Sequence, residues 1–186
     1  MEKEEINIIE SILNGNSRQY TVLVEKYSQQ IFSLIFQITE NQEDAEELTQ
    51  DTFLKAYQNL KKFKQESSFS TWIYRIAYNT AISATRKKKY TCYVDEQQLT
   101  ILSDVNVDEA LNSDSEENCE ALREAVSKLD AKEKALISMF YEDDKSIKDI
   151  CEITLETESN IKVKLHRIRC KLYLLMKGET YENRKR

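Results

Sequence analysis

Residues 44–57 read DAEELTQDTFLKAY, and the spacing of their apolar side chains decides the fold of this part of the chain. Apolar or small residues recur three or four positions apart, which is the period of one face of an α-helix. We therefore expect a helix from about residue 42 to about residue 60. The face that we expect to be buried consists of Ala45, Leu48, Thr52, Ala56 and Leu60.

The same helix carries a second, acidic face. Glu43, Glu47 and Gln50 lie on it, with Asp44 and Asp51 at its flanks. Acids in the first turn of a helix stabilise its dipole, and this accounts for Glu43 and Asp44. The dipole does not account for Gln50 and Asp51, because they lie two turns further along the helix.

The composition of the whole chain favours an all-α fold. Its 186 residues include no proline, and the only glycines are Gly15 and Gly178. Strand-rich folds need turn residues repeatedly, so this composition indicates helices joined by polar turns. The length suits one ordinary domain or two small ones.

Charge and periodicity divide the chain into four parts. Helical patterns fill residues 1–90, and they return over 119–176. Residues 91–118 lose the helical period and carry acids without a single lysine or arginine. We expect two small helical domains joined by a flexible acidic linker, and a basic tail over 177–186.

Several classes of function find no support in the sequence. The cysteines are dispersed without a CxxC pair, and His166 does not complete a zinc site with them, so we expect reduced thiols and no metal. No catalytic constellation or phosphate-binding loop appears, so we expect neither an enzyme nor a cofactor. The chain lacks an apolar run of membrane-spanning length and a secretory signal, so we expect a cytoplasmic protein without membrane insertion.

The second domain shows the pattern of a helix-turn-helix. Ser146 and Thr157 are suited to cap a short helix and a longer basic helix. The longer helix has an apolar stripe of Ile161, Leu165, Ile168, Leu172 and Leu175. Its outward residues suit a DNA major groove, although a solvated basic helix on a helical bundle fits the spacing as well. These outward residues are Ser159, Asn160, Lys162, Val163, Lys164, His166 and Arg167.

Residues 69–79, FSTWIYRIAYN, interleave aromatic and polar side chains before the basic run of residues 86–89. Trp72, Arg75 and Asn79 fall near a different helical stripe from the expected core residues. Aromatic faces beside cations hold unstacked bases, at about 1–3 kcal/mol per base. A core role for the aromatic residues and a solvated helix end for the lysines fit the spacing equally well.

These motifs, taken in their order, resemble the extracytoplasmic-function sigma factors of bacteria. The resemblance implies a domain that binds core RNA polymerase and melts the downstream promoter element, followed by a domain that reads the upstream element. It implies polymerase binding by Glu43, Asp44, Glu47, Leu48, Gln50 and Asp51. It implies downstream-element binding by Phe69, Ser70, Thr71, Trp72, Arg75, Asn79, Arg86, Lys87 and Lys88. The upstream-element residues that it implies are the outward set of the second domain.

The resemblance also implies an anti-sigma factor as a regulatory partner. The chain departs from the family where Ser159-Asn160 replaces a usual Gly-Thr pair and where Val163 replaces a frequent serine. Two alternatives remain at this point. The chain could be a stand-alone helix-turn-helix regulator that acts without polymerase, or a helical adaptor that binds only protein.

Overall fold

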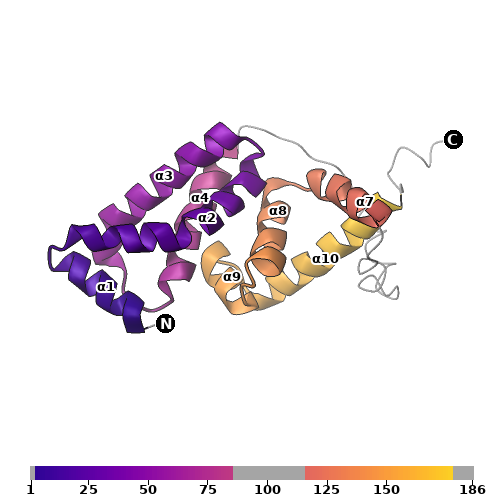
Figure 1. Cartoon of the computed structure of the whole chain (residues 1–186). Coiled ribbons are helices and arrows are strands. Elements are labelled where there is room, and N and C mark those ends of the chain that lie inside the picture. The colour runs from indigo at the N-terminus through magenta and orange to yellow at the C-terminus, as the bar shows by residue number, and fades with distance from the viewer. Residues whose placement is uncertain (1–2, 86–115, 178–186) are drawn as a thin grey trace.

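The computed structural model describes residues 3–85 and 116–177, and all regular structure within these ranges is helical (Figure 1). The all-α expectation is confirmed. Most of the expected acidic linker, the basic run of residues 86–89 and the tail from residue 178 lie outside the described residues.

The first domain contains α1 (Lys3–Leu13), η1 (Ser17–Gln19), α2 (Tyr20–Thr39), α3 (Gln42–Asn59), η2 (Leu60–Lys62) and α4 (Phe69–Thr85). The second domain contains α7 (Glu116–Ser127), α8 (Ala131–Ile137), the π-helical η4 (Ser138–Glu142), α9 (Ile147–Thr154) and α10 (Glu158–Met176).

Polar side chains start the helices of the helix-turn-helix where the sequence predicts them. The Asp149 N–H donates to the Ser146 hydroxyl at 3.1 Å, and the Asn160 N–H donates to the Thr157 hydroxyl at 3.3 Å. These bonds satisfy N–H groups that have no partner within the helix. Leu155 stands between α9 and α10 with a φ of 60°, so the turn is tight although it has no glycine.

The core of the first domain forms between α2, α3 and α4. On α3, Ala45, Thr52 and Ala56 are fully buried, which confirms most of the predicted apolar stripe. Leu48 is only half-buried, and Phe53 is buried at 7% exposure although it lies outside that stripe. The buried surface of α3 is therefore wider than the sequence pattern indicates, because α2 and α4 both pack against it.

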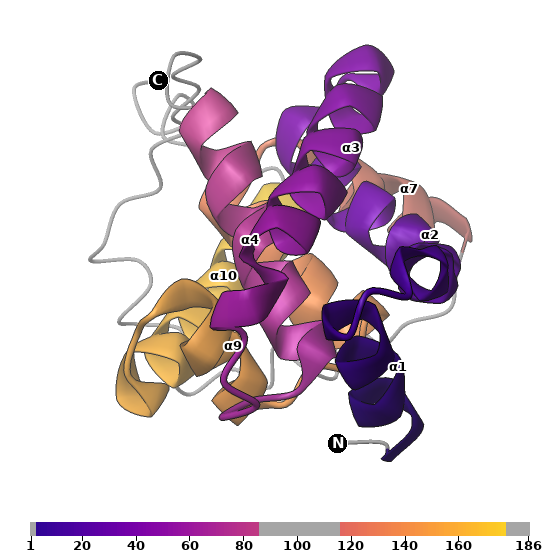
Figure 2. The ribbon, with the colours of Figure 1, turned by 90° about the vertical axis from the view of Figure 1, so that its left-hand side faces the viewer.

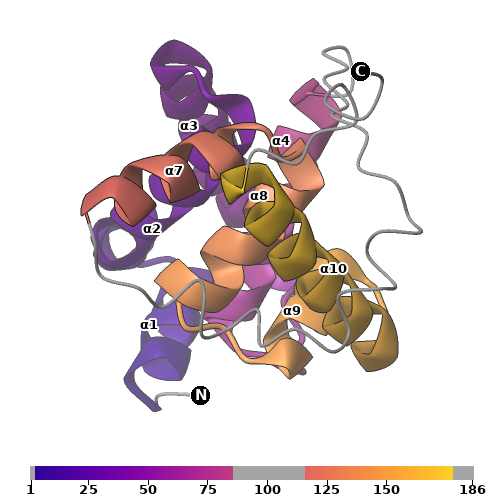
Figure 3. The ribbon, with the colours of Figure 1, turned by 90° about the vertical axis from the view of Figure 1, so that its right-hand side faces the viewer.

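In the second domain, α10 packs against α7, α8 and α9 through its predicted apolar stripe (Figure 3). Lys171 lies on α10 among other lysines and arginines, which alone would suggest an exposed cation, but the structure buries it at 8% exposure. Its ammonium donates to Glu133 Oε2 at 2.7 Å, and the same oxygen accepts the Asp130 N–H at 2.9 Å. Lys171 therefore joins α10 to the start of α8 and is not part of an exposed surface.

The two domains pack directly against each other. Helix α4 packs against α9, and Figure 2 shows α9 beside one end of α4. Helix α2 packs against α8, and one set of buried apolar side chains runs through both domains. Helix α7 begins at Glu116, somewhat before the expected domain start at residue 119. The sequence suggests two separate bodies, but it holds no signal for the surface that they share.

Candidate protein and nucleic-acid interfaces

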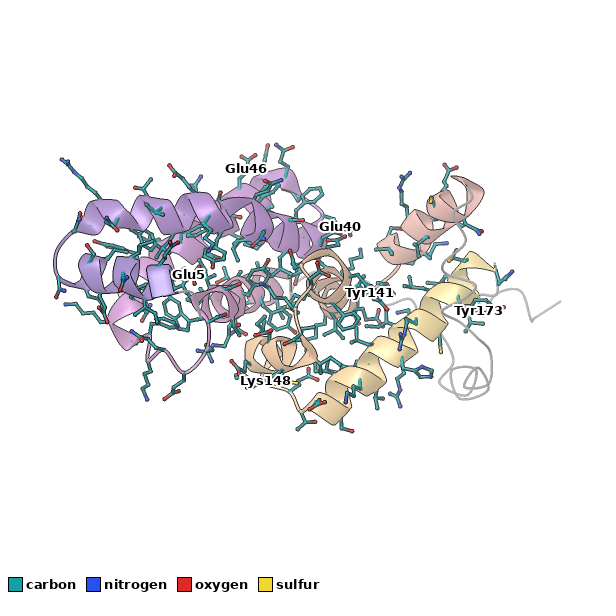
Figure 4. The ribbon with its side chains drawn as sticks, turned by 60° about the horizontal axis from the view of Figure 1, so that its bottom comes forward. Glu5, Glu40, Glu46, Tyr141, Lys148 and Tyr173 are labelled. Carbon is teal, nitrogen blue, oxygen red and sulfur yellow. The ribbon has the colours of Figure 1, made fainter. Side chains whose placement is uncertain are left out.

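The acidic face of α3 is open to solvent. Glu43, Glu47 and Gln50 are exposed, and Asp51 is half-buried with its carboxylate 3.8 Å from the Lys55 ammonium. Figure 4 shows Glu46 on the same outer side of α3, away from α9 and α10. A run of carboxylates and an amide along one exposed helix face attracts a basic partner surface.

The other two predicted polymerase-binding residues have different surroundings. Asp44 is exposed, and its backbone N–H donates to the Asn41 side chain at 2.8 Å, so it lies in the capped first turn. Leu48 is half-buried against the core and presents only part of its side chain. Asp44 therefore adds to the exposed acidic face from its first turn, and Leu48 contributes little to it.

An apolar groove continues this face toward the end of α3, and the sequence prediction did not include it. Leu54 and Tyr57 are 55% and 42% exposed, and they line a cavity of about 480 Å³ together with residues of α2. The Tyr20 ring lies 4.9 Å from the Tyr57 ring, and its hydroxyl donates to the Phe53 carbonyl at 2.7 Å. Leu54 follows Asp51 by three residues, so the same helical spacing could have indicated it.

The predicted downstream-element residues on α4 differ in accessibility. Phe69, Thr71 and Trp72 are buried, Ser70 and Arg75 are half-buried, and Asn79 is exposed. In this arrangement Phe69 and Thr71 offer almost no surface to a base, and Trp72 offers little. Arg86, Lys87 and Lys88 lie outside the described residues.

The burial of the α4 aromatic residues has a local cause. The Trp72 ring lies 5.2 Å from the Phe63 ring and 5.7 Å from the Phe69 ring, and these three residues form one cluster. Aromatic residues in such tilted contacts bury a large apolar area. The core role that the spacing left open therefore applies to Phe69 and Trp72 in this structure.

Trp72 nevertheless forms part of the wall of an open cavity of about 490 Å³. Lys62, Lys64 and Arg75 line the same cavity together with Glu66, so cations outnumber acids on its first-domain side. The sequence prediction missed the two lysines, although they lie in the short segment that leads into α4. The opposite side of the cavity is formed by Glu152 and Leu155 of the second domain.

The predicted upstream-element residues form one exposed face at the start of α10. Ser159, Asn160, Lys162, Val163, His166 and Arg167 are exposed, and Lys164 is half-buried. The structure thus brings this set together on the surface opposite the buried stripe.

Two lysines of this face are already paired with acids. The Lys162 ammonium lies 2.6 Å from Glu158, and it lowers the pKa of that exposed carboxyl by hydrogen bonding. The Lys164 ammonium lies 2.6 Å from Glu156. A DNA phosphate would have to compete with these carboxylates for the two lysines.

Two family models match the chain. The model for sigma-70 region 2 matches residues 23–91, and the model for sigma-70 region 4 matches residues 119–172. These matches define a sigma factor in which sigma-70 region 2 is followed by sigma-70 region 4.

Curated relatives narrow the class further. The chain is 31% identical to the ECF RNA polymerase sigma factor SigW of Bacillus subtilis over 86% of its own length and 89% of that protein. It is 30% identical to the RNA polymerase sigma factor YlaC of the same organism, covering 87% of this chain and 94% of YlaC. The chain belongs to the extracytoplasmic-function sigma factors. Such proteins are not enzymes; they bind core RNA polymerase and promoter DNA to begin transcription.

Solved structures show the same fold. CnrH in complex with the cytosolic domain of CnrY matches with a TM-score of 0.65 at 18% identity, over 93% of this chain and 97% of that chain. The sigma factor RpoE in complex with the anti-sigma factor NepR from Bartonella quintana matches with a TM-score of 0.62 at 17% identity, over 86% and 98%.

The part of the chain that the structure describes holds neither a metal site nor a membrane span. Within residues 3–85 and 116–177, no group of histidine, cysteine and acidic side chains could hold a metal ion. Among the helices in these ranges, none is long and apolar enough to cross a membrane.

Proposed function

We propose that this sigma factor binds core RNA polymerase through the exposed face of α3 that contains Glu47, Gln50 and Asp51. The observation that carries the proposal is that these side chains face solvent while the opposite side of α3 is buried. Leu54 and Tyr57 extend the surface with exposed apolar area. A polar face continued by an apolar patch has the composition of a protein interface.

We further propose that α4 and the cation-lined cavity beside it bind the melted downstream element. Arg75 and Asn79 are accessible on α4, and Lys62 and Lys64 add positive charge at the cavity. Support for Phe69, Thr71 and Trp72 as base contacts comes only from the family motif, because all three are buried here.

For the upstream element, we propose that the start of α10 enters the major groove. The exposed set from Ser159 to Arg167 offers hydroxyl, amide, cationic and methyl groups, which are the types that read base edges. The replacement of the family's usual residues at Ser159, Asn160 and Val163 suggests a promoter preference of its own.

Partners and location follow from this assignment. RpoE of Bartonella quintana was solved with an anti-sigma factor, and we propose a regulator of that kind for this chain. We also propose that the protein acts in the bacterial cytoplasm, where core polymerase and promoter DNA are found.

The test of polymerase binding is the double variant Glu47→Lys, Asp51→Lys. Reversal of two charges at an interface should abolish co-purification with core polymerase, because like charges then face the basic partner. The matched control is Glu10→Lys, Glu120→Lys, which reverses two exposed acids elsewhere and should co-purify as wild type does. Normal co-purification of the folded α3 variant would remove this face from the proposal.

Transcription in vitro separates the sigma-factor function from the two alternatives. Core polymerase with this chain should initiate at specific promoters, and core polymerase alone should not. A stand-alone regulator would instead bind duplex promoter DNA without polymerase, and an adaptor would bind no DNA.

A further inference from the structure

Glu156 has a fixed position in the turn that precedes α10. Leu155 before it has a φ of 60°, and the Glu156 N–H donates to the Cys151 carbonyl at 3.3 Å. Thr157 after it caps α10 with its hydroxyl. The backbone on both sides of Glu156 is therefore set by the end of α9 and the start of α10. Its side chain begins beside the face that we propose for the DNA major groove.

The carboxylate of Glu156 is paired with Lys164. The Lys164 ammonium donates to both carboxylate oxygens, at 2.6 Å and 2.5 Å, although the two residues are eight positions apart. Side chains on an α-helix lean toward its N-terminus, so Lys164 can reach back along α10 to the turn. Glu156 thus holds the ammonium of one residue of the proposed DNA-binding set.

The Glu156–Lys164 pair is less exposed than the neighbouring Glu158–Lys162 pair. The side chains of the first pair are 23% and 45% exposed, whereas those of the second pair are 65% and 58% exposed. Burial, together with the nearby Glu156 carboxylate, raises the pKa of Tyr78 on α4 to about 12, so Glu156 also lies close to the first domain. Water screens a partly buried pair less than an exposed one. Glu156 therefore restrains its lysine more firmly than Glu158 does.

A DNA phosphate would need the same ammonium that Glu156 holds. A lysine that neutralises a phosphate releases a counterion, and this release supplies affinity for DNA of any sequence. Lys164 already donates to two carboxylate oxygens, so it must leave them before it can contact a phosphate. The affinity gained from Lys164 is therefore the difference between the phosphate contact and the lost carboxylate contact.

We propose that Glu156 is an internal competitor for DNA phosphate at Lys164, which lowers the affinity of the second domain for DNA of every sequence. This inference rests on the proposed role of the start of α10 in DNA binding. Sites without a promoter far outnumber promoters, and phosphate contacts supply essentially all of the binding to such sites. A withheld phosphate contact therefore leaves less of the protein bound to DNA outside promoters.

The testing variant is Glu156→Gln in the full chain, which keeps the size of the side chain and removes its charge. Its matched control is Glu124→Gln on α7, where the Lys128 ammonium lies 2.8 Å from the Glu124 carboxylate. The control makes the same chemical change and also frees one lysine. Helix α7 packs against α10, and Figure 1 shows it beside the C-terminal end of that helix, away from the proposed DNA face.

The measurement is the affinity of each full chain for a fluorescent duplex of mixed sequence, by anisotropy over a range of KCl concentrations. Removal of the Glu156 charge should raise the affinity at low salt by about fivefold. A lysine newly engaged with phosphate should also steepen the plot of log affinity against log salt by about 0.9. The control should match wild type in this slope.

A double-mutant cycle separates a freed lysine from the loss of a negative charge alone. If Glu156 acts through Lys164, the gain from Glu156→Gln should vanish in a chain that already carries Lys164→Gln. A gain of the same size with and without Lys164 would overturn the proposal, because the carboxylate would then act by general repulsion of DNA. If circular dichroism shows that Glu156→Gln does not fold, Glu156→Asp weakens the pair by its shorter reach. It should then change affinity and slope in the same direction by a smaller amount.

Arg167→Ala distinguishes failure of this inference from failure of the proposed function, because Arg167 is exposed on the same face of α10. If Arg167→Ala and Lys164→Gln weaken binding but Glu156→Gln changes nothing, α10 binds DNA and Glu156 is not a competitor. If none of the three variants changes binding, the start of α10 is not a DNA surface. The proposed function of this helix and the inference then fail together.

Discussion

Helix α4 and helix α10 each carry a motif that resembles a DNA-binding segment of the family, but the two motifs differ in their exposure to solvent. The motif on α10 is exposed from Ser159 to Arg167, with its apolar stripe buried behind it. The motif on α4 is covered, partly by the Phe63–Phe69–Trp72 cluster and partly by the start of α9. One of the two proposed DNA surfaces is exposed, and the other is largely covered.

The difference shows what a helical period can and cannot predict. On α10 the two faces differ strongly in polarity, so the period identifies both the buried and the exposed face. On α4 the aromatic residues are spread over more than one face, and an aromatic ring suits a core as well as a base stack. Accessibility then depends on neighbours that are distant in sequence.

Removal of the Trp72 ring should have the largest effect on the free energy of unfolding. It tests whether the aromatic residues of α4 stabilise the core. Trp72 is 8% exposed and contacts two other aromatic rings. Trp72→Ala should lower the free energy of unfolding by about 3–5 kcal/mol, as measured by urea denaturation followed by circular dichroism. The α10 counterpart Val163→Ala, at 45% exposure, should change it by less than about 0.5 kcal/mol. A Trp72 variant as stable as wild type would show that the residue does not stabilise the core.

Lys171→Ala should have an intermediate effect on the free energy of unfolding. It tests whether this buried lysine of α10 differs in role from the exposed basic residues of the same helix. It removes the bond to Glu133, although Glu133 keeps its bond to the Asp130 N–H. The expected loss is about 1–3 kcal/mol in the free energy of unfolding. Promoter preference should stay as in wild type in the surviving folded protein. A stable variant with altered promoter choice would place Lys171 on the DNA surface after all.

Lys162→Ala should have the smallest effect on stability and the clearest effect on promoter choice. Its pair with Glu158 is exposed and spans one helical turn, so its loss should cost about 0.3–0.5 kcal/mol. If Lys162 contacts a base edge, discrimination at one position of the upstream element should fall by about 1–3 kcal/mol. Transcription from a library with a randomised upstream element measures this directly. A uniform decrease over all sequences would instead indicate a phosphate contact.

Much of the fold was predictable from single segments of sequence. The all-α class followed from the scarcity of turn residues, and the stripe of α10 proved to be buried at each of its predicted positions. The Ser146 and Thr157 caps were also located correctly, because a cap depends on residues that adjoin it in the chain.

The residues that the sequence missed or misplaced depend on distant partners. Lys171 reads as one more surface cation, yet Glu133 on another helix holds it in the interior. Lys145 carries no motif, and the sequence places Asp149 only at the end of the Ser146 cap. Their contacts with Ser70 and Thr71, which lie more than seventy positions away, follow from the packing of the two domains. The spacing of residues within one helix cannot indicate contacts between residues so far apart in the sequence.

The sequence by itself determined the helical class, the order of the two sigma regions, the acidic face of α3 and the exposed face of α10. Each of these depends on spacing within one helix or on composition, which are local properties of the chain. Only the tertiary structure decided that the domains touch, that Trp72 is buried and that α9 occupies the start of α4. These features depend on which helix faces come together, because burial and charge pairing are set by the packing of distant segments.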